Sequence, residues 1–178
     1  SGSSSSSWAQ DELAIGFFLD PEPTLANYQL AAGANFTLMV GTTPKNTSEM
    51  ALQAELCGRT GLKCILGGPP HLSGDACHGS AGNVDPQALP PPSSSVWGYY
   101  LQDEPQQQAF PSVKAQQDRL HAAHPGSLVF LNVGPPGHWF GPGSATPAAE
   151  AEYIRYLDEV EPDLLSFDCC KLCAMPFY

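Results

Sequence analysis

Short apolar segments alternate along this chain with longer segments of helical character, and this alternation limits the folds open to it. The short segments, which we expect to be strands, span residues 14–20, 35–40, 63–66, 97–104, 128–133 and 164–167. The expected helices span residues 24–32, 48–57, 110–123 and 147–160. Strands that alternate with helices form parallel sheets through right-handed crossovers. The sequence therefore predicts an α/β domain over residues 13–178, preceded by a Ser-rich flexible segment at residues 1–12.

The segment after the first strand and the chain length bear on which parallel architecture forms. Asp20-Pro21-Glu22-Pro23 stands where a dinucleotide-binding Rossmann fold carries its Gly-x-Gly-x-x-Gly loop, which weakens that alternative. A TIM-barrel-like (β/α) barrel is favoured, but a complete one needs about 250 residues. The chain has 178, so we expect an incomplete barrel of about six strands. Residues 67–95 read as a loop in place of a third helix, with a short helical turn near residues 85–89.

The charge of the chain argues against two classes of partner. The formal net charge is −11 with only seven Lys and Arg residues, so there is no basic footprint for nucleic acid or for anionic membranes. The chain also lacks an apolar run close to the ~20 residues of a membrane-spanning helix. We expect neither a nucleic-acid partner nor a membrane span.

Cysteines and glycosylation motifs indicate an extracellular, oxidising location. The chain has six cysteines, and sequons begin at Asn35 and at Asn46. Asn46 lies in an expected loop, whereas Asn35 lies at the entrance to an expected strand, so Asn46 is the better candidate for a glycan. Because the chain begins with Ser1 rather than Met, we interpret it as processed or as a fragment.

Each cysteine has an expected partner, although the connectivity of the last ones stays open. Cys57 and Cys64 flank a short connection and are expected to form a disulfide. The further expected bonds join Cys77 to one of Cys169, Cys170 and Cys173, and the remaining two to each other. A zinc site at the last two cysteines lacks a second ligand pair of suitable spacing, so we expect no metal or other cofactor.

The most informative single stretch is Trp97-Gly98-Tyr99-Tyr100-Leu101-Gln102-Asp103-Glu104-Pro105, an aromatic strand that ends in two carboxylates and a proline. Aromatic residues favour strands, and Pro105 cannot donate to the ladder. Alternation along a strand places Leu101 and Asp103 on one face, and Gln102 and Glu104 on the other. We therefore expect that at most one of the two acids reaches a strand-lined pocket by simple strand geometry.

Polar residues end several of the expected strands. Because parallel strands end at one edge of their sheet, these side chains should converge there: Asp20, Asp103, Glu104, Asn132 and Asp168. Hydrolysis of a glycosidic bond needs two carboxyl groups, about 5 Å apart for retention and about 6.5–9.5 Å for inversion. A plainer alternative is that these acids cap strand ends and form turns, which Asp favours in any case.

The Asp103-Glu104-Pro105 motif at the end of the fourth strand resembles the (β/α)8 glycoside hydrolases of the large retaining clan. Residues 153–157 and 162–168 look like the helix 5 to strand 6 segment of glycosidase-like barrels, and the resemblance covers roughly residues 14–168. It implies that Glu104 is the general acid/base and that Asp103 contacts the sugar. The family nucleophile, a Glu at the end of strand 7, has no counterpart in this chain.

An aromatic loop after the fifth strand offers a sugar platform. Trp139, within His138-Trp139-Phe140, could stack on a pyranose ring or plug the loop onto the barrel, and the sequence favours neither. Trp97, which opens the fourth strand, is expected in the core.

The leading hypothesis is a secreted glycoside hydrolase-like domain that acts on or binds a polysaccharide, with Glu104 as acid/base and with Asp103 and Asn132 positioning sugar hydroxyls. The alternative is a non-catalytic structural or carbohydrate-associated module of an extracellular glycoprotein assembly, such as a cell wall or fibre. A third is a small α/β domain unrelated to sugars. Open sheet edges also predict self-assembly, or further polypeptide that completes the barrel. A second carboxylate within ~10 Å of Glu104 would separate the first two hypotheses.

Overall fold

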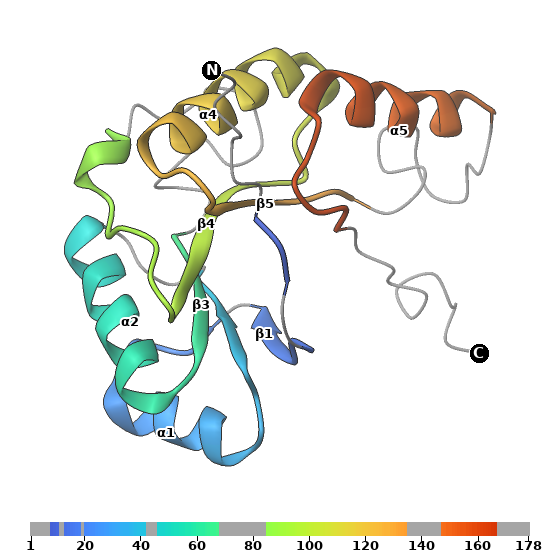
Figure 1. Cartoon of the computed structure of the whole chain (residues 1–178). Helices are drawn as coiled ribbons and strands as arrows, with labels where there is room; N and C mark the ends of the chain where they lie inside the picture. Colours follow the sequence, from blue (N-terminus) through green and yellow to red (C-terminus); the bar gives the residue numbers. More distant parts are fainter. Residues whose placement is uncertain are drawn as a thin grey trace, which may run out of the picture.

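The structure is a computed structural model that describes residues 8–10, 13–18, 20–41, 46–67, 85–134 and 147–166. Its centre is a parallel sheet in which five strands follow one another in chain order (Figure 1). The strands are β1 (Gly16–Phe18), β2 (Leu38–Val40), β3 (Lys63–Leu66), β4 (Val96–Asp103) and β5 (Leu128–Asn132). The helices are α1 (Leu25–Gly33), α2 (Thr47–Thr60), α4 (Phe110–Ala123) and α5 (Pro147–Val160), with short 3-10 turns η1 (Pro86–Ala88) and η2 (Gln107–Ala109). The predicted α/β class and parallel sheet are confirmed.

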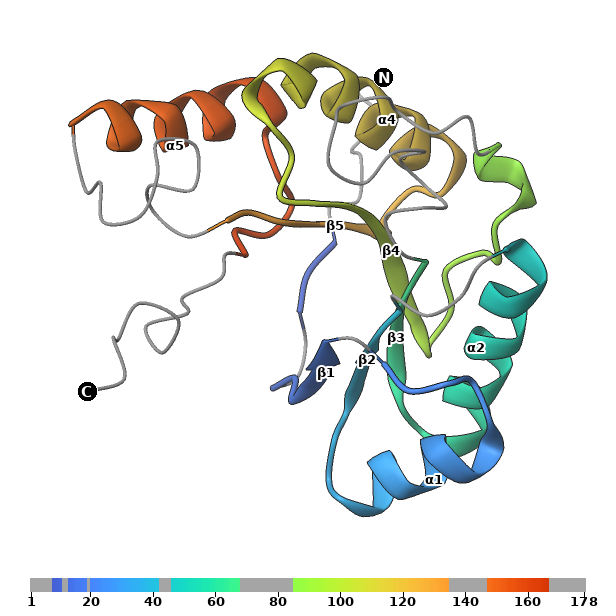
Figure 2. The same ribbon diagram turned by 180° about the vertical axis from the view of Figure 1, so that it is seen from behind.

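The four helices pack on one face of the sheet. The larger core cluster combines side chains of α1, α2, α4 and α5 with strand side chains such as Met39, Leu66 and Val129. The smaller cluster on the opposite face joins strand residues, among them Ile65 and Phe130, with no helix of the described chain. Figures 1 and 2 show the helices following one side of the curved sheet. A doubly wound Rossmann sheet reverses its strand order and carries helices on both faces, so this arrangement does not fit it.

The sixth strand predicted at residues 164–167 is not formed in its described part, because residues 164–166 run beside the end of β5 without joining the five-stranded sheet. The Val133 amide donates to the Ser166 carbonyl at 3.0 Å. Nearer the start of β5, the Val129 amide donates to a carboxylate oxygen of Asp163 at 2.7 Å. The segment at residues 164–166 therefore lies beside β5, and the sheet is open over the described residues.

Local hydrogen bonds explain where α2 begins and ends. The Asn46 side chain accepts from the Glu49 amide at 2.9 Å and donates to the Glu49 carboxylate at 3.0 Å, a reciprocal cap. Gly61, in the left-handed conformation with φ of 76°, ends the helix. The helix predicted over residues 48–57 therefore begins one residue earlier, at Thr47, and extends to Thr60.

Two irregularities interrupt β4. Its pairing with β3 passes from Val96 directly to Gly98, and its pairing with β5 passes from Tyr100 directly to Gln102. Each leaves one extra residue on β4, Trp97 in the first case and Leu101 in the second, as in a β-bulge. Gly98 lies so close to β5 that a Cβ atom there would overlap the backbone of Leu128.

Candidate functional site

The second bulge in β4 decides which way Asp103 points. Paired residues of neighbouring strands project from the same face, and Asp103 pairs with Asn132. Strict alternation would have placed Asp103 on the helix side with Leu101, which belongs to the larger core. The extra residue at Leu101 resets the alternation, so Asp103 shares the opposite face with Asn132. The prediction that Asp103 follows Leu101 was therefore wrong.

Asp103, Asn132 and Ser166 form a chain of hydrogen bonds from three segments. The Asn132 amide nitrogen donates to Asp103 Oδ1 at 3.0 Å, and the Ser166 hydroxyl donates to Asn132 Oδ1 at 3.0 Å. Asn132 is only 3% exposed, so both ends of its amide are used in a buried setting. Because a carboxylate only accepts hydrogen bonds, the amide nitrogen of Asn132 must face Asp103. The two hydrogen bonds therefore hold the Asn132 amide in one orientation.

Ser166 is the one member of this hydrogen-bonded trio that sequence reasoning missed. Serine favours loops and turns and carries no charge, so its type alone signals little. Its position within the predicted sixth strand was the available signal, since strands beside β5 end at the same edge of the sheet.

Glu104 follows β4 directly and has an unusual backbone. Its φ is 42°, in the left-handed region that disfavours residues with a Cβ atom. Its amide donates to the Asn132 carbonyl at 2.7 Å, which ties this turn to the end of β5. Such strain costs of order 1–3 kcal/mol and clusters at functional sites. The half-buried Glu104 is thus held at the carboxyl edge beside the Asp103–Asn132 pair.

The charge of Glu104 affects the pKa of Tyr153 on α5. Burial raises the pKa of Tyr153, and the negative charge of Glu104 raises it further. The Tyr153 hydroxyl donates to the Gly134 carbonyl, just beyond β5. The Tyr153 side chain of α5 therefore lies near the carboxyl end of β5, within the influence of the Glu104 charge.

Asp20 has partners that suit a structural role. It is 4% exposed, and it accepts hydrogen bonds from the Tyr28 hydroxyl at 3.2 Å and from the Gln53 side chain at 2.9 Å. These partners lie on α1 and α2, so Asp20 joins two helices to the end of β1. Burial, followed by the charge of Asp20, raises the pKa of Tyr28. The plainer interpretation, a strand-end carboxylate used for structure, explains these contacts.

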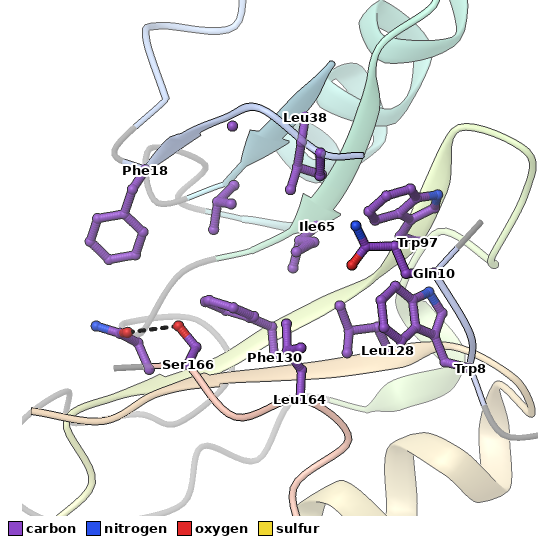
Figure 3. A pocket seen from close by; sticks show the side chains of 14 residues that line it. Trp8, Gln10, Phe18, Leu38, Ile65, Trp97, Leu128, Phe130, Leu164 and Ser166 are labelled. Atoms are coloured by element: carbon purple, nitrogen blue, oxygen red, sulfur yellow. Dashed lines mark hydrogen bonds between the residues drawn. The ribbon is translucent and has the colours of Figure 1, made fainter. Parts of the chain in front are cut away.

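A pocket of about 280 Å³ opens on the helix-free face of the sheet (Figure 3). Trp8, Trp97 and Gln10 lie together on one side of it, and Phe18 and Ser166 lie on the other. The two tryptophan rings pack edge to face with centroids 5.6 Å apart. Trp97, expected in the core, is half-buried and lines this pocket. Asn132 and Ser166 supply polar groups to an otherwise mainly apolar lining.

The remaining predicted site residues divide into two groups. Cys57 and Cys64 are buried free thiols, so the expected disulfide is not formed in this structure. Asn35 is exposed with φ of 64°, whereas the Asn46 side chain serves as a helix cap, and glycosylation of either stays a prediction. The others lie outside the described residues: Cys77, Trp139, Asp168, Cys169, Cys170 and Cys173.

Two further findings concern the described part of the chain. It contains no group of three or more His, Cys, Asp or Glu side chains arranged to hold a metal ion. Among its helices, none combines the length and the apolar character that crossing a membrane requires.

Comparison with known proteins gives no relative from which a function could be transferred. No protein-family model, no curated protein and no solved structure matches this chain.

Proposed function

We propose that the chain is a secreted glycoside hydrolase-like (β/α) barrel domain that acts on or binds a polysaccharide at the carboxyl edge of its sheet. The observation that carries the proposal is Glu104, held in a left-handed turn beside the hydrogen-bonded Asp103–Asn132 pair. Glu104 is the general acid/base, and Asp103 and Asn132 position sugar hydroxyls. A substrate of this kind is an extracellular glycan, which agrees with the predicted location.

The arrangement of elements supports the barrel. Strands that follow chain order, with every helix of the described part on one face, are how a TIM barrel is built up strand by strand. Active sites of such barrels lie at the carboxyl ends of the strands, where Asp103 and Glu104 stand. Further polypeptide, or self-assembly of the chain, would close the open sheet.

Hydrolysis of a glycosidic bond requires one carboxyl group that protonates the leaving oxygen and a second that acts as nucleophile or base. Glu104 is assigned the first role because it follows β4 directly at the carboxyl edge of the sheet and is half-buried. Asp20 is a poor second group, since Tyr28 and Gln53 already bind its carboxylate inside the fold. The engagement of Asp20 is what favours the alternative function, a carbohydrate-binding or structural module without hydrolysis.

The test uses the whole chain against soluble β-1,3-glucan, β-1,4-glucan, xylan and mannan. Binding is followed by affinity electrophoresis and hydrolysis by release of reducing ends. Glu104→Gln should lower hydrolysis by about 10²–10⁴-fold while keeping binding. The matched control is Glu55→Gln, because Glu55 is an exposed partner of Arg59 on α2 and should leave both unchanged.

Each result has a distinct meaning. Hydrolysis that depends on Glu104 supports the enzyme. Binding without hydrolysis, unchanged by Glu104→Gln, supports the non-catalytic module. Neither binding nor hydrolysis of any of the four polysaccharides would contradict both and leave an α/β domain unrelated to sugars.

A further inference from the structure

Two buried thiols, Cys57 on α2 and Cys64 on β3, lie in the same part of the core. Cys57 and Cys64 both have exposures of 0% and belong to the same core cluster. Cys57 Sγ donates to the Lys63 carbonyl at 3.7 Å, which places it against the peptide group that leads into Cys64. Cys64 Sγ donates to the Ser95 carbonyl at 3.3 Å. Cys57 is also the leading neighbour that raises the pKa of the Cys64 thiol. Cys57 Sγ therefore lies beside the backbone segment that carries Cys64.

We propose that Cys57 and Cys64 close into a disulfide while the chain folds, and that a pair left reduced becomes unreactive once the core has formed around it. In the closing step both thiols lose their protons and the pair loses two electrons. A disulfide oxidant accepts the electrons by thiol–disulfide exchange and leaves as two thiols. The product is a covalent link between the end of α2 and the start of β3.

The core protects the reduced pair in two ways. The side chains have no exposed surface, so an oxidant reaches them only when the structure opens. The thiolate is also scarce, because contact with Cys57, burial and the charge of Asp20 together raise the pKa of Cys64. Since the thiolate is the attacking species, a raised pKa slows exchange at ambient pH.

Whether the disulfide forms depends on when the oxidant is present. An unfolded chain exposes both thiols and lets them pair across a short connection. A folded, reduced chain should hold them as thiols even in the presence of oxidant. The same sequence thus has two long-lived forms, set by whether oxidant is present during folding.

The experiment compares two treatments of the full chain after complete reduction. In one, oxidised glutathione is added to the folded protein. In the other, it is added in urea, and the protein is then refolded. Digestion with trypsin cuts after Arg59 and Lys63, between the two cysteines, so a link appears as two joined peptides in the mass spectrum. Cys64→Ser and Cys77→Ser identify the partner, because Cys64 and Cys77 share one tryptic peptide.

We expect the link in the refolded sample, lost with Cys64→Ser and kept with Cys77→Ser. In the folded sample it should form roughly a hundredfold more slowly. The linked form should melt about 5 °C higher than the reduced form. Absence of the link after refolding, or equal rates in the two treatments, would overturn the proposal.

Discussion

At the scale of single residues, the site depends on backbone and amide orientations rather than on charge alone. Glu104 adopts a conformation that few residues with a side chain tolerate, and its amide is bound to the end of β5. Asn132 is held from both sides by Asp103 and Ser166. Both features can be tested by variants that change one interaction and leave its neighbours in place.

The strain at Glu104 predicts an order of stability for two variants that both remove its carboxylate. Glu104→Gly should be about 1 kcal/mol more stable than Glu104→Ala, because glycine adopts positive φ without a Cβ clash. Urea unfolding of the two proteins measures the difference. Equal stability would mean that the left-handed turn is absent in solution.

The hydroxyl of Ser166 should be needed to hold Asn132. Ser166→Ala leaves the buried Asn132 Oδ1 without its donor and should lower the free energy of unfolding by about 1–3 kcal/mol. Ser166→Thr keeps the hydroxyl and is the matched control. Side-chain amide NMR of Asn132 supplies a second measurement, in which only the alanine variant should show faster hydrogen exchange. Unchanged exchange in Ser166→Ala would refute this role.

At the scale of the elements, β4 is the strand that shapes the site. One bulge adds Trp97 to the pocket lining, and the other turns Asp103 toward Asn132. The close approach of β4 and β5 at Gly98 makes this pairing possible. Cap contacts at Asn46 and Gly61 set only the length of α2.

A side chain at Gly98 should destabilise the sheet severely. A Cβ at this position would overlap the Leu128 backbone, which cannot move without breaking the β4–β5 ladder. Gly98→Ala should cost about 3 kcal/mol or more in thermal or urea unfolding. Gly33→Ala is the matched control, since nothing lies within 4 Å of its added Cβ. Similar losses for the two variants would contradict the close strand approach.

At the scale of the whole molecule, the larger core joins distant parts of the chain through buried tyrosines. Tyr28 on α1, Tyr99 on β4 and Tyr156 on α5 are each 0% exposed. Burial is the leading cause that raises the pKa of all three above the ordinary value of 10.0. The protonated form is therefore favoured in the folded state.

This burial predicts alkaline unfolding. Below pH 10 the tyrosines are protonated in both states, and their full contribution to stability is present. As the pH rises above 10, the unfolded chain loses protons that the folded one keeps, so stability falls. Tyrosinate absorbance of these residues should appear together with loss of the circular dichroism signal. The burial would be contradicted if the tyrosinate absorbance of all the tyrosines rose gradually near pH 10 while the circular dichroism signal stayed unchanged.

Much of the fold could be predicted because its signals are local. Apolar periodicity, caps and proline positions lie within a few residues of one another, and they predicted α4 and α5 at their observed bounds. The candidate site was harder to predict than the fold. Asp103 was predicted as a site residue but was assigned to the wrong face of the sheet. The bulge at Leu101 changes the face, and this bulge depends on how β4 pairs with β5. Asp20 was grouped with the acids at the sheet edge, although the side chains of Tyr28, 8 residues away, and Gln53, 33 residues away, bind its carboxylate.

The sequence by itself therefore determined the α/β class, the order of the elements and the edge of the sheet at which polar residues gather. Only the tertiary structure decided that Asp103 binds Asn132, that Ser166 orients the Asn132 amide, and that Cys57 and Cys64 are buried as free thiols. The physical reason is that hydrophobic patterns act over one or two turns of chain. Strand register and hydrogen bonds between β4, β5 and residues 164–166 instead join positions up to 34 residues apart.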